Sequence, residues 1–242
     1  MEIRRFFVSP SDVQGNTVTV RGDEFAHMTR VLRYKVGYSA IICANDGIEH
    51  LCTVKSIYKD YAELSIESSR VADVKGVNLT LYAGLLKNNK LDFAIQKAVE
   101  LGVDRIVPFT SANCAESKFS QDRAQKIALE AAKQCGSAYL SDVGKLATID
   151  EVIGELNCYD DVLFAYECEK EHRIADCKPN GKRIALIIGP EGGFTPDEAD
   201  RIAKAGASTV TLGRRILRAE TASIVACAIL LDALGELDCK EA

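Results

Sequence analysis

The stretch that decides the fold is RIALIIGPEGGFTPDE, which spans residues 183–198. Residues 184–188 are continuously apolar, as in a strand that is buried on both faces of a sheet. The segment GPEGG at 189–193 predicts a tight loop in which the backbone can approach a ligand closely. A helix is expected to follow, because Thr195 is a favourable N-cap and Glu198 completes a capping box.

A second strand and loop come next in the chain. Residues 208–212 predict the strand, and Gly213 opens a loop that contains three arginines, Arg214, Arg215 and Arg218. In α/β sheets the loops at the carboxyl ends of parallel strands form the ligand site. A glycine cluster alone also fits an ordinary strand-to-helix turn. The apolar pair at 216–217 between arginines is unusual for a plain turn, so the residue types favour a functional site.

The composition limits the class of protein. With 242 residues, of which 47% are hydrophobic, the chain can form one large or two modest domains. No apolar run approaches the roughly 18 residues of a membrane span, and the charged start lacks a signal-peptide pattern. Nine scattered cysteines without a C-x-x-C pair suggest reduced thiols rather than disulfides or a zinc site. We therefore expect a cytoplasmic protein with no membrane partner and no metal.

The charge is distributed unevenly. A net charge of -5 argues against a bulk nucleic-acid coat but is compatible with a local basic surface. Residues 1–40 hold six basic and four acidic side chains, so the amino-terminal region is where such a surface is expected.

The first 70 or so residues contain short β-prone runs separated by turn signals, including Asn-Asp-Gly at 45–47. This pattern predicts a barrel or barrel-like sheet. One helix is expected at 23–33, with Phe25, Met28 and Leu32 on its apolar face. His27, Arg30 and Tyr34 lie at helical spacing on another face, where a solvated surface and an RNA contact are both open. Residues 70–76 are polar and fit a linker.

From residue 77 the pattern alternates between strands and helices, which predicts a parallel sheet of five strands. The expected strands are 78–85, 105–109, 161–166, 184–188 and 208–212, and the expected helices are 91–101, 120–135, a short one after Thr148, 196–206 and 220–234. The loop KNNK at 87–90 follows the first strand, at the same sheet edge as the two glycine loops. Lys87 and Lys90 there either aid solubility or contact phosphate.

Several motifs together resemble the 16S ribosomal RNA uridine N3-methyltransferase family of the SPOUT superfamily. The matching segments are RRFFV at 4–8, HxxRVLR at 27–33, QKAVELG at 96–102, AAxQCG at 131–136, IGPEGGF at 188–194 and LGxRILRxETA at 212–222. The resemblance covers nearly the whole chain, and its last two motifs are specific. The chain departs from the family at Ser137 and Ser141, where such proteins usually have an arginine and a proline.

The resemblance implies a PUA-like β-barrel for RNA binding at 1–72 and a SPOUT methyltransferase domain at 73–242, with a parallel sheet and a trefoil knot. It implies S-adenosylmethionine as cofactor and a homodimer with each pocket close to the partner chain. The implied substrate is 16S ribosomal RNA, and both the free RNA and the RNA within the small ribosomal subunit are open. The implied cofactor contacts are Gly189, Leu212 and Leu217, then Glu191 and Gly193, with Gly213 and Ile216 beside them. The implied RNA contacts are Arg4, Arg5, His27, Arg30, Arg33, Lys87 and Lys90.

The chemistry of such a reaction agrees with the residue types. Uridine N3 must lose its proton to become a nucleophile, and the resulting anion spreads onto the ring oxygens. A guanidinium beside those oxygens would stabilise the anion by roughly 3 kcal/mol, like one oxyanion-hole donor. Arg218 is the candidate, and Glu220 either orients that guanidinium or accepts the proton.

Two other functions are open from the sequence. The first is a non-catalytic RNA-binding protein with a degenerate cofactor pocket, against which the intact motifs at 188–194 and 212–222 argue. The second is a phosphate-handling enzyme whose glycine loop holds a nucleotide at a helix N-terminus. Its loop would need a lysine that is absent here, and Glu191 would repel phosphate.

Overall fold

The computed structural model describes residues 3–72, 75–87 and 89–238. The chain forms two compact units. The first contains the described residues up to 72 together with Ala132–Leu140, and the second contains the remaining described residues. The assignment of Ala132–Leu140 to the first unit was not anticipated from the sequence. The predicted linker at 70–76 begins too early, because a strand continues through Val71, and residues 73–74 lie outside the described part.

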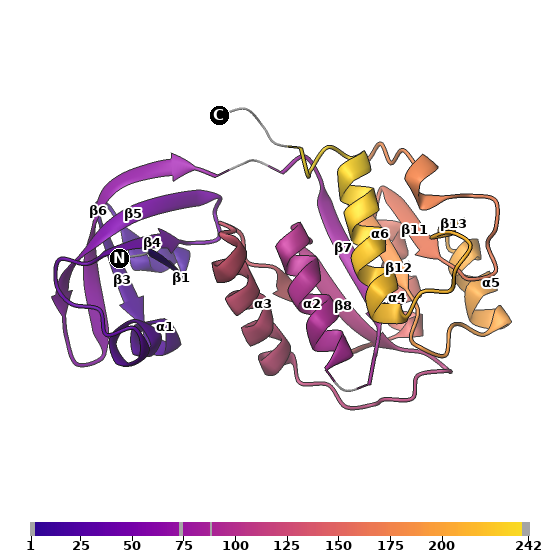
Figure 1. Cartoon of the computed structure of the whole chain (residues 1–242), viewed down its shortest axis with the longest axis horizontal. Coiled ribbons are helices and arrows are strands. Elements are labelled where there is room, and N and C mark those ends of the chain that lie inside the picture. The colour runs from indigo at the N-terminus through magenta and orange to yellow at the C-terminus, as the bar shows by residue number, and fades with distance from the viewer. Residues whose placement is uncertain (1–2, 73–74, 88, 239–242) are drawn as a thin grey trace. The chain divides into compact units, whose positions relative to one another are not determined.

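The first unit is built on a curled six-stranded sheet of order β1-β4-β5-β6-β3-β2 (Figure 1). Its strands are β1 (Arg4–Phe7), β2 (Val13–Gln14), β3 (Thr17–Arg21), β4 (Ser39–Cys43), β5 (Ile48–Ile57) and β6 (Tyr61–Val71). β1 runs parallel to β4 and the other pairs are antiparallel. The barrel-like β-rich unit predicted from the turn signals is therefore confirmed, and the 45–47 turn joins β4 to β5 as expected.

The helix of this unit differs from the prediction at its end. α1 (Gly22–Ala26) continues into a π-helical turn, η2 (His27–Val31), and Arg33 then adopts a left-handed φ of 54°. Phe25 and Met28 are buried, as predicted. Tyr34 is not on a shared face with His27, because it lies beyond the helix, is buried in the core and packs edge-on against Phe6.

The second unit is built on a fully parallel seven-stranded sheet of order β10-β8-β7-β12-β11-β13, with β9 also paired to β8. Its strands are β7 (Asn78–Gly84), β8 (Arg105–Thr110), β9 (Asp142–Val143), β10 (Ala147–Thr148), β11 (Asp161–Ala165), β12 (Arg183–Ile188) and β13 (Ser208–Val210). The predicted parallel α/β fold is confirmed. The predicted number of strands was too low, because β9 and β10 have two residues each and leave no apolar run to detect.

The helices of this unit begin and end at the expected signals. They are α2 (Lys90–Leu101), α3 (Gln121–Cys135), α4 (Ile149–Glu155), α5 (Pro196–Lys204) and α6 (Ala219–Ala233). Two short 3-10 turns, η3 (Leu156–Cys158) and η4 (Ile174–Asp176), also belong to this unit, and a third, η1 (Pro10–Asp12), belongs to the first unit. Thr148 and Thr195 form the predicted capping boxes with Glu151 and Glu198. Gly102, with a φ of 94°, ends α2.

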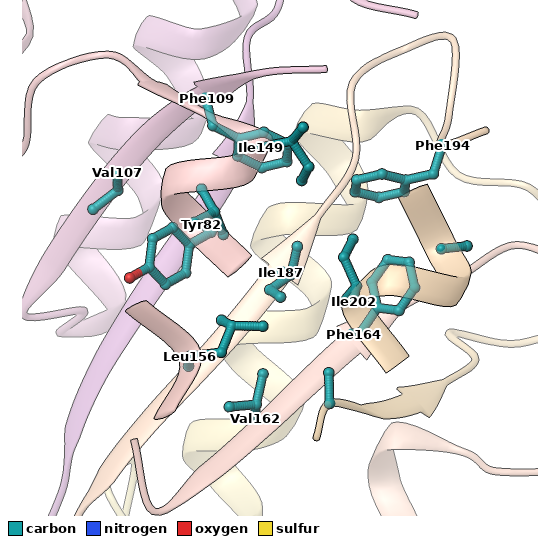
Figure 2. Packing of buried hydrophobic residues seen from close by; sticks show 14 residues of the cluster. Tyr82, Val107, Phe109, Ile149, Leu156, Val162, Phe164, Ile187, Phe194 and Ile202 are labelled. Carbon is teal, nitrogen blue, oxygen red and sulfur yellow. The ribbon is translucent and has the colours of Figure 1, made fainter. Parts of the chain in front are cut away.

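The sheet of the second unit is covered on both faces. α4 and α5 pack on one face over a core that includes Phe109, Phe164 and Phe194 (Figure 2). α6, yellow in Figure 1, lies across β7 and β12 next to α2 and covers the other face. The Phe194 ring meets that of Phe164 edge-on at 4.9 Å between centroids. The loop that follows β12 is thus anchored in the core by its own phenylalanine.

Candidate active site

Strand register brings four loops to one edge of the parallel sheet. Ile188 of β12 lies opposite Ala83 of β7 and Ala165 of β11, and Ala165 lies opposite Val210 of β13. The loops that follow these four strands therefore begin at the same edge of the sheet, at matching register positions. Since β11 alone separates β12 from β13, the starts of the glycine loop (189–193) and the arginine loop (211–218) are two strand spacings apart, roughly 10 Å.

Close contacts around the glycine loop leave no space for a Cβ atom at Gly84 or at Gly189. A Cβ atom on Gly84, at the end of β7, would overlap the Pro190 nitrogen and lie 2.6 Å from the Gly189 carbonyl carbon. A Cβ on Gly189 would lie 2.6 Å from the Phe194 ring. On its other side the loop accepts a 3.2 Å hydrogen bond at the Gly192 carbonyl from the Asn113 side chain. The backbone path of this loop thus depends on glycine at the end of β7 and at the first position after β12.

Glu191 projects from the glycine loop into an ion pair with Lys90 at the start of α2. Both side chains are about one-third exposed. The Lys90 ammonium lowers the pKa of the Glu191 carboxyl. Lys90 was predicted to meet RNA phosphate, but in this structure its charge is paired with Glu191. Lys87 is exposed, and Asn88 of the same loop lies outside the described residues.

The arginine loop is fixed by backbone hydrogen bonds at its first residue and is exposed to solvent at its tip. The Thr211 N–H donates to the His172 carbonyl at 2.7 Å, and the Ile174 N–H donates to the Thr211 carbonyl at 3.1 Å. β13 ends at Val210, two residues before the predicted end, because Thr211 pairs only as an isolated bridge. The Ile216 side chain at the tip is 90% exposed, whereas Leu212 and Leu217 are half-buried.

Arg218 and Glu220 lie where this loop becomes α6. Arg218 is the N-cap residue, is exposed, and its side chain makes no capping hydrogen bond. Glu220 stands in the first turn of α6, where the helix dipole favours a negative charge. One carboxylate oxygen of Glu220 is buried without a hydrogen-bond partner among the described residues. A buried acceptor left without a donor costs about 1–3 kcal/mol, and one oxygen of Glu24 in the first unit is in the same situation.

Glu169 organises the loop after β11, which lies between the two others. Its Oε1 accepts hydrogen bonds from the backbone N–H groups of Glu171 at 2.7 Å and His172 at 3.2 Å. Its Oε2 accepts from the Thr209 hydroxyl at 2.8 Å. Through Thr209 and His172, this single carboxylate fixes the loop after β11 against β13 and the base of the arginine loop.

These hydrogen bonds predict an acid-sensitive contribution to stability. The Glu171 N–H, followed by the Thr209 hydroxyl, holds the pKa of the Glu169 carboxyl well below its ordinary value of 4.5. A carboxyl with a depressed folded-state pKa stabilises the fold fully above its unfolded pKa, and this contribution is lost progressively as pH falls from the unfolded pKa towards the folded pKa. When the pH is lowered from about 5 to about 3, we expect the free energy of unfolding to fall less in the Glu169→Gln variant than in the wild-type protein. Urea midpoints at the two pH values measure this, and parallel losses would contradict it.

The candidate RNA residues of the first unit occupy different environments. Arg4, Arg30 and Arg33 are exposed, and the half-buried His27 has its Nδ1 3.5 Å from the Lys133 ammonium. Arg5 differs from the expectation of a surface contact.

The Arg5 side chain is 8% exposed and forms a 2.9 Å ion pair with Glu49, whose side chain is 7% exposed. Its guanidinium also donates to the Cys43 sulfur at 2.9 Å. A buried charge needs such partners. The prediction that Arg5 presents its charge to RNA is corrected, because the pairing of β1, β4 and β5 turns that side chain inward against Glu49.

The two serines that depart from the family pattern have local roles. The Ser137 hydroxyl donates to the Tyr139 carbonyl at 2.8 Å and accepts from the Tyr139 N–H at 3.1 Å. The buried Ser141 hydroxyl donates to the Val103 carbonyl at 2.6 Å. Each hydroxyl therefore satisfies nearby backbone groups.

The described residues contain neither a candidate metal-binding cluster nor a candidate membrane-spanning helix. No group of three or more histidine, cysteine or acidic side chains that could hold a metal ion occurs in that part of the chain. None of its helices has both the length and the apolar character needed to cross a membrane. The eight described cysteines are free thiols, and Cys239 lies outside the described residues.

Sequence reasoning missed the contacts that support the site. Gly84, Asn113 and Glu169 were not singled out, and the Lys90–Glu191 pair was not foreseen. Gly84 carried the clearest signal, since it is a glycine at the end of a buried parallel strand, where a close approach of another backbone is expected. Glu169 carried none, because it lies in an acidic, exposed segment.

Comparison with known proteins identifies the class. A family model described as an RNA methyltransferase domain matches residues 74–231, and one described as an RNA methyltransferase PUA domain matches residues 20–67. A crystal structure of ribosomal RNA small subunit methyltransferase E from Neisseria gonorrhoeae, bound to S-adenosyl methionine, superposes with a TM-score of 0.84. Its sequence is 28% identical to this chain, and the superposition covers 96% of this chain and 98% of the Neisseria gonorrhoeae chain. Together these matches define an RNA methyltransferase with a PUA domain.

Full-length relatives narrow the class to a family. Ribosomal RNA small subunit methyltransferase E of Bacillus subtilis is 30% identical over 93% of this chain and 94% of its own length. The protein of that name from Rickettsia conorii is also 30% identical, over 94% and 95%. The chain belongs to the ribosomal RNA small subunit methyltransferase E family.

Proposed function

We propose that this protein transfers a methyl group from S-adenosylmethionine to N3 of a specific uridine in 16S ribosomal RNA. Membership of an RNA methyltransferase family supports the reaction type. The observation that carries the proposal is that the glycine loop and the arginine loop start at one sheet edge, with Glu220 directly after the arginine loop in the first turn of α6. A substrate within the assembled small ribosomal subunit, and a cytoplasmic location, are parts of the same proposal.

The two loops fit S-adenosylmethionine. Close packing at Gly84 and Gly189 fixes the backbone of the glycine loop, and main-chain groups held in this way suit recognition of an adenine. Half-buried Leu212 and Leu217 provide apolar contact on the other side. The residues proposed to hold the cofactor are Gly189, Glu191, Gly193, Leu212, Gly213, Ile216 and Leu217. When bound, S-adenosylmethionine supplies a methyl group already activated by its sulfonium.

Arg218 and Glu220 are the proposed catalytic residues. The Arg218 guanidinium would neutralise the charge that develops on the uracil oxygens when N3 loses its proton. Glu220 either orients that guanidinium or accepts the proton. A Glu220→Gln variant separates these roles, because the amide oxygen can still accept a hydrogen bond from the guanidinium but cannot accept the proton; a rate close to that of the wild type therefore indicates the orienting role.

In this proposal one part of the chain binds RNA and the other part carries out methyl transfer. We place the RNA-binding PUA-like domain at 1–72 and the methyltransferase domain at 73–242. Exposed arginines in the first part suit phosphate contacts. The proposed RNA contacts are Arg4, His27, Arg30, Arg33, Lys87 and Lys90, and Arg5 is omitted because of its buried ion pair. Lys90 would exchange Glu191 for a phosphate when RNA binds.

A homodimer and a trefoil knot complete the proposal. α6 carries partly exposed apolar side chains at Ile224 and Val225 beside its buried ones, which suits a second copy of the chain as partner. β12 inserts between β7 and β11, an order that accommodates a knotted return of the chain. Light scattering tests the dimer, for which a monomeric mass at micromolar concentration would be the contrary result.

Two measurements test the function. Calorimetry with S-adenosylmethionine should show saturable heat. Mass mapping of nucleosides in 16S ribosomal RNA from a deletion strain should show the loss of one N3-methyluridine, restored by the wild-type gene. If the protein binds RNA but gives no heat with S-adenosylmethionine and the nucleoside pattern is unchanged, it is the non-catalytic RNA-binding protein instead.

A further inference from the structure

The turn between β5 and β6 displays two stacked tyrosines. The rings of Tyr58 and Tyr61 lie 4.5 Å apart between centroids, at an interplanar angle of 21°. The Tyr58 N–H donates to the Tyr61 carbonyl at 2.8 Å and closes the turn. Tyr58 is 46% exposed. The pair therefore presents aromatic surface to solvent on a short turn that is closed by a backbone hydrogen bond.

Basic side chains accompany this pair. The Arg21 guanidinium lies 5.3 Å from the centroid of the Tyr61 ring, and Arg21 is the register partner of Tyr61 across β3 and β6. Its side chain is 61% exposed and is also paired with Asp12 at 3.3 Å. Lys55 and Lys59 are exposed in the same hairpin, as is Asp60, and the Tyr58 hydroxyl lies 3.5 Å from the Glu63 carboxylate.

This combination matches the requirements for binding unpaired nucleotides. An aromatic face stacks on any base, and neighbouring cations meet the backbone phosphates. Tyrosines are also common in protein interfaces, but the guanidinium held at the ring and the flanking lysines favour RNA. The residues of the hairpin lie within the match to the PUA domain of RNA methyltransferases, at 20–67.

We propose that Tyr58, supported by Tyr61 and Arg21, is a stacking site for an unpaired base of the RNA substrate. The inference rests on the proposed function for the identity of the ligand, and it adds a binding site that none of the sequence motifs contains. Its failure is distinguishable from failure of the function, because wild-type methylation of 16S ribosomal RNA and heat with S-adenosylmethionine are measured without any Tyr58 variant and can be positive whether or not Tyr58 stacks on a base.

Binding of the Tyr58 variants to deproteinised 16S ribosomal RNA and to assembled small subunits tests the site. Tyr58→Ala should weaken both interactions about tenfold, and Tyr58→Phe, which keeps the ring, should bind like wild type. Stacking releases no counterions, so the salt slope should stay unchanged in Tyr58→Ala. The matched charge variant Lys59→Ala should instead reduce that slope by roughly 0.7.

A fluorescent probe reports stacking directly. The chain has no tryptophan, so Tyr58→Trp introduces a single indole whose emission a stacked base should quench. Val71→Trp, at the other end of β6 and 72% exposed, is the matched control and should not respond. Unchanged affinity of Tyr58→Ala, or equal quenching of both probes, would overturn the proposal. A loss confined to assembled subunits would also overturn it, because the hairpin would then contact a ribosomal protein.

Discussion

Replacing Arg218 with alanine should lower the rate of methyl transfer by about 100- to 1,000-fold while leaving the affinity for S-adenosylmethionine unchanged. The reason is electrostatic, since a guanidinium beside the uracil oxygens acts only once N3 has lost its proton. Its removal should therefore cost about 3 kcal/mol in the transition state and little in the ground state. Because the Arg218 side chain makes no capping hydrogen bond to α6, the fold should tolerate the change.

A neighbouring arginine provides the control for this experiment. Arg214 lies in the same loop and is also exposed, so Arg214→Ala removes an equal charge without removing the proposed catalytic group. Single-turnover rates and calorimetry should show a large kinetic loss for Arg218→Ala alone. Equal rate losses in both variants would indicate a general charge effect, and a parallel loss of cofactor affinity would indicate a structural role for Arg218.

The second large effect is expected at Gly84. An alanine methyl group there would overlap the Pro190 nitrogen, and two backbones cannot separate as easily as flexible side chains. We expect Gly84→Ala to destabilise the fold by about 3 kcal/mol and to displace Gly189 from its place at the proposed cofactor site. Urea unfolding measures the first effect, and calorimetry with S-adenosylmethionine measures the second.

Gly154 supplies the matched control for Gly84. It lies exposed in α4, and a Cβ atom there would meet nothing within 4 Å. Gly154→Ala should therefore stabilise the protein by about 0.5–1 kcal/mol, because alanine favours the helix and restricts the unfolded chain. If Gly84→Ala were as stable as Gly154→Ala and bound the cofactor normally, the result would contradict the close contact described between β7 and the glycine loop.

The sequence predicted most of the second unit because its signals are local. The apolar run of β12, the two capping boxes and the glycine that ends α2 each depend on neighbouring residues in the chain. The edge strands β9 and β10 escaped prediction, because two residues do not establish a periodicity. The proximity of the two loops followed from the parallel order of the strands, whereas the Lys90–Glu191 pair joins segments far apart in sequence.

The first unit was predicted less well, for a physical reason. Arg4 and Arg5 are adjacent and chemically alike, and only the pairing of β1 with β4, and of β4 with β5, brings Arg5 to Glu49. Helical spacing grouped Tyr34 with His27, but the π-helical turn and the left-handed Arg33 end the helix before Tyr34. A spacing rule fails once the backbone leaves the regular helix.

The place of β12 in the sheet has a consequence for biosynthesis. β12 alone joins the β8–β7 side of the sheet to β11 and β13, yet it is made long after β7. While the ribosome is still translating, the apolar β7 has one edge without its native neighbour, and such edges promote aggregation. We expect nascent chains arrested before β12 to recruit chaperones, and chains extended past α6 to be released from them.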